Sequence, residues 1–486
     1  MAIKTVAVIG AGPAGLTAAY RLAQHGINVK VFEAGDSVGG MAKTIPLWGQ
    51  LVDLGPHRFF SGDPRVNRIW LEVIGDDYSM VSRLTRIYYR KTLFDYPLKA
   101  FNALAGLGVV EAAYCILSFL KAKVFPEKDE STFEAWVANR FGRRLFGIFF
   151  KSYSEKLWGI SCKELDADFA AQRIKKLSLF EAIKSAVLQS GGQKHRTLVD
   201  EFAYPHLGAG AVYERMADKI REFGGEVRLN TPVGSVLPAG TESEQARLTL
   251  SNGTECAFDH IISSMPITTL VDRMGAPADV GCHARALRFR NTIIVYLKIK
   301  GESPFPDQWI YVHAPDMQTG RISNFRNWVP SINKGSPDTI LCLEYWCYDD
   351  DALWSEDEEA LVGLATDEIY RSSLVPAGAV MDGKVVRVPK CYPVYAMDYR
   401  EHLEPVQNYL SKHKKLSVIG RYGAFKYNNQ DHSILMGLLA AENIVDGKKH
   451  DLWSVNTDDE YQESSKITAT GLSDIEDETQ GPVPSA

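Results

Sequence analysis

The distribution of apolar and polar positions divides the chain into segments with different periods. Residues 5–9 (TVAVI) are small and apolar, residues 15–24 (GLTAAYRLAQ) have apolar side chains at helical spacing, and residues 28–33 (NVKVFE) alternate. This order predicts a strand, a helix and a second strand. Residues 210–240 predict a helix followed by a strand, and residues 415–445 predict a strand, a glycine turn and a helix. We expect both segments to return to the first sheet.

The regions between these segments have two other patterns. Residues 85–200 are mainly helical in spacing, as in STFEAWVANRFGRRLFGIFFKSYSEKLWG, which starts with a Ser/Thr-x-x-Glu capping pattern at 131–134. Residues 266–400 alternate with a period of two, as in TIIVYLKIKG and DTILCLEYWCY. Such alternation predicts a mostly antiparallel sheet. The expected fold class is therefore α/β, with an inserted helical domain and a separate antiparallel sheet domain.

The turn after the first strand has the pattern of a dinucleotide site. Gly10 permits a tight turn, Gly12 lets the backbone approach a pyrophosphate, and Gly15 lets the helix pack closely on the strand. The helix N-terminus then faces the phosphates, and Glu33 lies where an acid accepts ribose hydroxyls. The contacts predicted here are Gly10, Gly12, Pro13, Ala14, Gly15, Glu33 and Ala34.

The residues after Glu33 favour FAD over a nicotinamide dinucleotide. Gly39 and Gly40 follow the acid where a nicotinamide dehydrogenase usually continues with a helix; a plain glycine turn is the alternative interpretation. The arrangement resembles FAD enzymes of the glutathione reductase and amine oxidase type. Val233 is then expected to bond the adenine through its backbone, and the last helix to face the flavin pyrimidine ring. Further expected FAD contacts are Gly39, Gly40, Met41, Gly55, Pro56, His57, Gly420, Arg421, Asn429, Gln430 and Ser433.

Composition narrows the class of protein. A chain of 486 residues is long enough for two or three domains, and a formal net charge of −6 gives no basic field for nucleic acid. The seven cysteines form no CxxC pair and have no zinc spacing, so we predict no metal site and a cytoplasmic enzyme with reduced thiols. The start, MAIKTVAVIGAGPAG, runs straight into a strand, so no signal peptide is predicted.

Residues 101–125 form the most apolar stretch of the chain. Glu111 and Lys121 interrupt it, which favours packed helices over a transmembrane segment and leaves peripheral membrane contact as the alternative. The resulting division is a Rossmann-like FAD domain of the glutathione reductase type in three parts, a helical insertion, a sheet domain and a flexible acidic tail. The expected boundaries are 1–85, 201–265 and 401–446 for the FAD domain, 86–200 for the helices, 266–400 for the sheet and 447–486 for the tail.

Five motifs carry a narrower resemblance. They are DLGPHRFF (53–60), LFDYPLKAF (93–101), YSEKLWG (153–159) with an arginine fifteen residues past its tryptophan, WIYVHAPDMQTGRISNF (309–325) and GRYGAFKYNNQDHS (420–433). On these motifs the chain resembles the UDP-galactopyranose mutase family, within the wider flavin amine oxidase and protoporphyrinogen oxidase superfamily. Phe425 departs from the last motif, where a tyrosine is expected.

The resemblance implies a redox-neutral interconversion of the pyranose and furanose forms of a nucleotide sugar of the UDP-galactose type. Reduced FAD would act as a nucleophile and form an N5 adduct with the sugar, with NADPH or NADH as a possible reductant. A leaving diphosphate needs bidentate arginines and hydroxyl donors. The expected catalytic residues are His57, Arg173 and Arg321, and the expected substrate-binding residues are Trp158, Arg173, Tyr311, Arg321, Tyr392, Tyr427 and Asn429.

Two other classes of function stay open. An FAD-dependent oxidase or desaturase of the amine oxidase or protoporphyrinogen oxidase type would favour an apolar or aromatic pocket, and a flavin-binding scaffold would need no reactive pocket. Three residues also have competing interpretations. We interpret Trp158 as a wall of the sugar site and not as a core residue, Lys156 as a brace for its loop, and Asp431 as the cap of the last helix. The number of subunits is not predicted.

Overall fold

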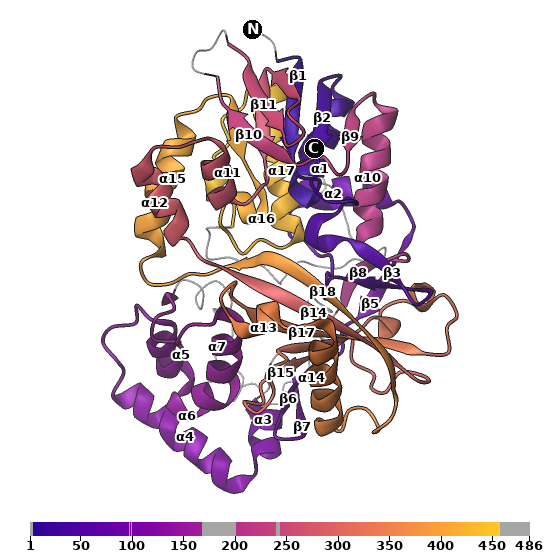
Figure 1. The fold of residues 1–486 in the computed structure, drawn as a ribbon. Helices are drawn as coiled ribbons and strands as arrows, with labels where there is room; N and C mark the ends of the chain where they lie inside the picture. Colours follow the sequence, from indigo (N-terminus) through magenta and orange to yellow (C-terminus); the bar gives the residue numbers. More distant parts are fainter. Residues whose placement is uncertain (1–2, 97, 99, 168–200, 240–243, 457–486) are drawn as a thin grey trace, which may run out of the picture.

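A computed structural model describes residues 3–96, 98, 100–167, 201–239 and 244–456 of the chain (Figure 1). A parallel sheet and its helices form the upper half of the view. The long strands of a second sheet cross below it, and a group of helices lies at the lower left. The mixed α/β class predicted from the sequence is confirmed.

The first sheet is parallel and draws its strands from three distant parts of the chain. The strand order is β19-β13-β1-β2-β9, and every neighbouring pair is parallel. Helices cover it because each parallel crossover passes over a face of the sheet. Its strands are β1 (Thr5–Ile9), β2 (Asn28–Phe32), β9 (Glu226–Arg228), β13 (His260–Ser263) and β19 (Leu416–Val418), and the helices around it are α1 (Pro13–Gln24), α2 (Pro64–Ile74), α10 (Gly210–Glu222) and α17 (Gln430–Val445).

Three small antiparallel sheets extend this half. One contains β10 (Val233–Leu237), β11 (Ala246–Leu250) and β12 (Glu255–Phe258) in that order. The other two are the pairs β3 (Thr44–Leu47) with β4 (Gln50–Asp53) and β5 (Tyr78–Ser82) with β8 (Glu201–Pro205). The helices α11 (Ile267–Arg273), α12 (Ala278–Ala286), α15 (Tyr399–Ser411) and α16 (Gly420–Gly423) complete it.

The second large sheet has seven strands in the order β18-β14-β17-β16-β15-β6-β7. All neighbours are antiparallel except β15 and β6, so the mostly antiparallel sheet predicted from period-two alternation is present. Two of its strands come from residues 85–95, which our boundaries assign to the FAD and helical segments; this assignment is corrected. The strands are β6 (Thr85–Tyr89), β7 (Thr92–Asp95), β14 (Phe289–Ile299), β15 (Trp309–Val312), β16 (Arg321–Asn324), β17 (Thr339–Cys347) and β18 (Val380–Pro393), with α13 (Ala352–Ser355) and α14 (Glu358–Arg371) beside them.

Within residues 100–167 the helices predicted for the first insertion are present, but the N-cap of α5 lies one residue later than predicted. The N-cap of α5 is Thr132, whose hydroxyl accepts a hydrogen bond from the amide of Ala135 (3.2 Å), so the cap is not Ser131. These helices are α3 (Ala100–Leu107), α4 (Val109–Val124), α5 (Phe133–Phe141), α6 (Arg143–Phe146) and α7 (Ser152–Trp158), with a π-helical turn at Gly147–Lys151. Within the described part of the chain, no helix is both long and apolar enough to cross a bilayer.

The first residues that our boundaries assign to a flexible tail are held by polar contacts. The Lys426 ammonium group is buried and donates hydrogen bonds to the carbonyls of Trp453 and Val455 (2.6 Å to the latter). Asn456 donates to the carbonyl of Tyr427 (3.2 Å). Polar contacts therefore hold residues 450–456, and we missed them because the prediction considered only how few apolar residues this segment has. Residues 457–486 lie outside the described part of the chain.

Candidate functional site

The glycine turn after β1 has the shape that a dinucleotide requires. Gly10 has φ = +95°, and a Cβ there would lie 2.3 Å from the Ser264 hydroxyl oxygen. A Cβ on Gly15 would lie 2.0 Å from the carbonyl oxygen of Gly10, so only glycine permits this approach of α1 to the turn. A Cβ on Gly12, in contrast, would meet only the Cα of Gly40, at 3.9 Å. The missing side chain of Gly12 thus leaves open space in front of the α1 N-terminus, which fits a diphosphate.

Glu33 and the second glycine pair close the other side of this turn. The Glu33 carboxylate accepts hydrogen bonds from the amides of Ala11 (2.7 Å) and Gly35 (2.8 Å). These two bonds hold the carboxylate in place and leave lone pairs for a ribose hydroxyl. Gly39 has φ = +98° and its amide donates to the carbonyl of Ala11 (2.8 Å), so the chain returns past the diphosphate position as expected. Val233 is the first residue of β10 and is buried, and it is not among the residues that line the cavity described next.

A cavity of about 290 Å³ lies where the parallel sheet meets the seven-stranded sheet. Its walls come from the α1 N-terminus, the 40–42 turn, the 56–60 loop, β15, β16, β18 and the 420–433 segment. Most of the predicted site residues are therefore brought together. Those lining it are Gly12, Pro13, Ala14, Gly40, Met41, Pro56, His57, Tyr311, Arg321, Tyr392, Gly420, Arg421, Tyr427, Asn429, Gln430 and Ser433.

Tyr311 and Arg321 are direct partners across β15 and β16, which explains the ten-residue spacing of the motif. The Arg321 guanidinium binds the carboxylate of Glu344 on β17 through two hydrogen bonds, Nε to Oε1 (2.6 Å) and Nη2 to Oε2 (2.5 Å). Glu344 is 2% exposed. This buried carboxylate fixes the plane of the guanidinium, which lines the cavity and also donates from Nη2 to the Tyr392 hydroxyl (3.4 Å). Sequence reasoning missed Glu344 because it lies in an apolar run.

Arg421 approaches the cavity from the other side. Its Nε donates to the carbonyl of Cys391 (2.7 Å) and its Nη1 to that of Asn428 (2.8 Å). The guanidinium carbon lies 4.8 Å from the ring centre of Tyr392 and 4.4 Å from that of Tyr427. The two tyrosine rings are stacked, with centroids 5.5 Å apart. Arg421 therefore anchors both tyrosines and contributes positive charge to this wall.

His57 lies in the loop after β4, where Gly55 has φ = +117°. Burial, together with the charges of Arg321 and Arg421, lowers the pKa of His57 to about 3. The ring is therefore neutral at pH 7. The carbonyl of His57 accepts a hydrogen bond from Gln430 Nε2 (3.0 Å), and Gln430 in turn accepts one from the Tyr213 hydroxyl (2.6 Å). This chain of contacts holds the histidine loop against the start of α17.

The start of α17 differs from the prediction. Asn429, not Asp431, is the N-cap, and the side chain of His432 returns to the Asn429 amide (3.3 Å) to complete a capping box. Asp431 lies in the first helical turn. The cap is Asn429 because its side chain is the one that reaches the free amides at the N-terminus. The capping residue therefore lines the cavity together with Ser433.

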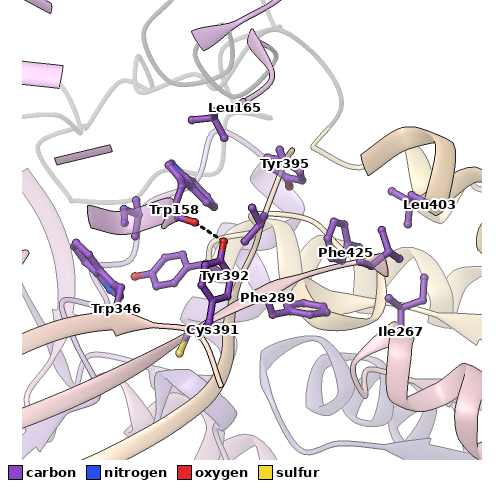
Figure 2. Close-up of a cluster of buried hydrophobic side chains, with 14 of the residues drawn as sticks. Trp158, Leu165, Ile267, Phe289, Trp346, Cys391, Tyr392, Tyr395, Leu403 and Phe425 are labelled. Carbon is purple, nitrogen blue, oxygen red and sulfur yellow. Dashed lines mark hydrogen bonds between the residues drawn. The ribbon is translucent and has the colours of Figure 1, made fainter. Parts of the chain in front are cut away.

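Trp158 lies in a cluster of buried side chains next to Tyr392 (Figure 2). It is 0% exposed, and its ring packs edge-on against Tyr392 (6.2 Å) and Tyr427 (5.9 Å). We expected Trp158 to line the sugar site; it does not line the cavity and instead packs against two tyrosines that do. Lys156 donates to the carbonyls of Val312 (3.0 Å) and Ala314 (2.7 Å), so its predicted role as a loop brace is confirmed.

The departure at Phe425 removes no hydroxyl from the cavity. Phe425 is 1% exposed and packs edge-on against Phe289, 5.0 Å away (Figure 2). Arg173 lies outside the described residues. Lining residues that we did not assign from the sequence are Ala42, Arg58, Phe60, Tyr96, Ser264, Trp309, Tyr422 and Asn428. Six of these residues lie within four of the quoted motifs, which is the signal that could have identified them: Arg58, Phe60, Tyr96, Trp309, Tyr422 and Asn428.

Comparison with known proteins establishes the family. The family model described as flavin-containing amine oxidoreductase matches residues 13–445. This chain belongs to the flavin-containing amine oxidoreductase family. Membership confirms the predicted flavin enzyme class and implies FAD as the cofactor, which the open turn at Gly12 and the anchored Glu33 fit.

The relatives within this family carry out different reactions. Coproporphyrinogen III oxidase of Staphylococcus aureus is 22% identical over 300 residues, which is 56% of this chain and 62% of that protein. A probable UDP-galactopyranose mutase of Klebsiella pneumoniae is 27% identical over 183 residues, 34% of this chain and 43% of that protein. A phytoene desaturase of Rhodobacter capsulatus is 28% identical over 283 residues, covering 53% and 51%. The alignments thus span less than two thirds of these relatives' own length.

Solved structures resemble this fold over nearly the whole chain. A reduced UDP-galactopyranose mutase superimposes with a TM-score of 0.82 at 20% identity, covering 94% of this chain and 98% of the other. A putative protoporphyrinogen oxidase from Exiguobacterium sp. 255-15 gives a TM-score of 0.70 at 17% identity, covering 92% and 100%. Both comparisons show a shared fold.

Proposed function

We propose that this protein is an FAD-dependent mutase that interconverts the pyranose and furanose forms of a UDP-galactose-type nucleotide sugar. The observation that carries the proposal is the lining of the cavity, where Arg321 and Arg421 face a set of tyrosines. Two arginines in one partly buried cavity suit a dianionic diphosphate, and hydroxyl groups suit a sugar. The overall resemblance to the reduced mutase supports the same function.

Each group would have a distinct part in this reaction. FAD, held by the Gly12 turn and Glu33, would supply the nucleophile when it is bound in the reduced form. Arg321 and Arg421 would bind the diphosphate and stabilise its charge as the bond to the anomeric carbon breaks. The neutral His57 ring or its carbonyl would accept a hydrogen bond from an N–H group of the bound flavin. No electrons are gained or lost overall, because the same bond to the diphosphate re-forms after the sugar ring changes size.

Several further assignments belong to the same proposal. We take NADPH or NADH as the reductant of the flavin. We place the protein in the cytoplasm, because all seven cysteines are free thiols. Residues 1–85, 201–265 and 401–446 would together form the FAD domain.

A second candidate is an oxidase or desaturase, which the coproporphyrinogen oxidase and phytoene desaturase relatives favour. One experiment separates the two. Purified protein is reduced with dithionite without oxygen and mixed with UDP-galactofuranose, and the products are resolved by chromatography. A mutase forms UDP-galactopyranose, whereas an oxidase or desaturase leaves the nucleotide sugar unchanged. Replacing Arg173 with Ala should weaken UDP binding and leave the flavin content unchanged.

A further inference from the structure

Helix α4 (Val109–Val124) exposes a set of large apolar side chains to solvent. Val109 is 88% exposed, Leu117 is 61% exposed, and Phe125, which follows the helix, is 75% exposed. Cys115 is buried, and Glu111, Ser118 and Phe119 are only partly exposed. Single exposed apolar residues are ordinary, but a contiguous set on one helix marks an interaction surface. The exposed apolar residues are Val109, Val110, Tyr114, Ile116, Leu117, Leu120, Val124 and Phe125.

The contacts of the opposite face fix this orientation. The Glu111 carboxylate accepts two hydrogen bonds from the Arg144 guanidinium, the longer 2.8 Å. The Ser118 hydroxyl accepts a hydrogen bond from the Arg144 amide (3.0 Å). A Cβ on Gly142 would lie 2.6 Å from the Phe119 amide nitrogen, so the α5–α6 turn touches the backbone of α4. The helix cannot rotate its apolar face inward without losing all three contacts.

The apolar face is a stripe with a lysine on each side. At about 100° per residue, Val109, Leu117, Leu120, Val124 and Val110 fall within a sector of about 100°. Lys123 lies just beyond one border of this sector and Lys121 just beyond the other, and both are exposed. In the sequence from 109 to 125, Glu111 is the single acidic residue, and it faces inward onto Arg144. The rim of the stripe is therefore cationic.

This charge pattern decides what can cover the stripe. A second copy would bring another pair of lysines against the first without acidic residues from the same helix to neutralise them. An anionic bilayer surface accepts both features, because apolar side chains enter the region between headgroups and acyl chains while flanking lysines contact the lipid phosphates. Figure 1 shows α4 at the lower edge of the molecule, beyond α6, where a flat surface can approach it.

We propose that α4 docks the protein onto an anionic membrane surface, lying parallel to it with Val109, Leu117, Leu120 and Val124 inserted. Lys121 and Lys123 provide the electrostatic contribution, which salt weakens. The docking site lies on the helical segment, remote from the cavity that holds Arg321 and Arg421. It therefore does not depend on which reaction the cavity catalyses.

The test is sedimentation of the full-length flavin-loaded protein with vesicles of phosphatidylcholine, with and without phosphatidylserine. Wild-type protein should bind the anionic vesicles, and raising the salt concentration should reduce binding. The triple variant Leu117→Gln, Leu120→Gln, Val124→Gln should bind about 100-fold more weakly, because it loses the favourable transfer of three apolar side chains from water into the bilayer. The matched control replaces Leu237 and Met381, exposed apolar residues of β10 and β18, with Gln and should bind like wild type.

Two results would overturn the proposal. One is a wild-type protein that fails to bind anionic vesicles, or a triple variant that binds them as well as wild type. The other is a wild-type dimer in analytical ultracentrifugation that the triple variant converts to monomer without any vesicle binding, because a second copy then covers the stripe. Flavin content and thermal midpoint measured on each variant separate these results from misfolding.

Discussion

Replacing Glu344 with Gln tests the buried ion pair that positions Arg321. The Arg321 guanidinium donates hydrogen bonds of 2.6 and 2.5 Å to the Glu344 carboxylate, Glu344 is 2% exposed, and the Arg321 side chain is 15% exposed. Removing one partner of a buried pair leaves the other charge without compensation and typically costs about 3–5 kcal/mol. Glutamine keeps the shape and one acceptor, so we expect a loss of about 3 kcal/mol in the free energy of unfolding.

The assay is urea unfolding followed by tryptophan fluorescence, with Glu358→Gln as the matched control. Glu358 pairs with Lys384 at 3.2 Å, but both side chains are about half exposed. An exposed pair contributes at most about 1 kcal/mol, so the control should lose no more than that. A double variant, Arg321→Leu with Glu344→Leu, should recover most of the loss because no charge remains buried. A loss below about 1 kcal/mol in Glu344→Gln, or a double variant that loses at least as much stability as Glu344→Gln, would contradict this expectation.

Three further predictions concern the flavin turn, the cavity wall and pH. Gly12→Ala should fold normally but bind FAD weakly, because its Cβ enters the open space that fits the diphosphate. Gly15→Ala should lower the thermal midpoint, because its Cβ lies 2.0 Å from the carbonyl oxygen of Gly10. Flavin absorbance and thermal unfolding distinguish the two effects. Tyr392→Phe should weaken UDP binding about tenfold in calorimetry with unchanged flavin content, and equal affinity would contradict the assigned hydroxyl contact. Burial lowers the pKa of His260 to about 4 from its ordinary 6.5, so only the unfolded chain gains its proton between these values. His260 should therefore contribute a fall in stability of about 1.4 kcal/mol per pH unit as the pH drops from 6.5 to 4, and His260→Asn should remove this part of the slope.

The sequence was most informative where backbone geometry demands a particular residue. Gly10 and Gly15 could be assigned because any side chain there collides with the backbone or with Ser264. The ten-residue spacing also placed Tyr311 and Arg321 together, because residues that face each other across two paired strands keep a fixed separation in the sequence. Local constraints of this kind can be recognised from short sequence motifs.

Features that depend on contacts distant in the chain were harder to predict. Trp158 was placed at the cavity from its charged neighbours, but it is buried behind Tyr392 and Tyr427, which come from other segments. Glu344 sits in a strand whose pattern suggests only core residues, and its partner is β16. We assigned β6 and β7 to other segments than the seven-stranded sheet, because the pairing of β6 with the distant strand β15 cannot be recognised from their own sequences.

The most direct test of the proposed function is the turnover of UDP-galactofuranose by dithionite-reduced protein without oxygen. We expect the reduced protein to form UDP-galactopyranose and the oxidised protein to convert little, and we expect Arg321→Ala to lose most of the conversion at unchanged flavin content. No conversion of the nucleotide sugar by the fully reduced, flavin-loaded protein would contradict it.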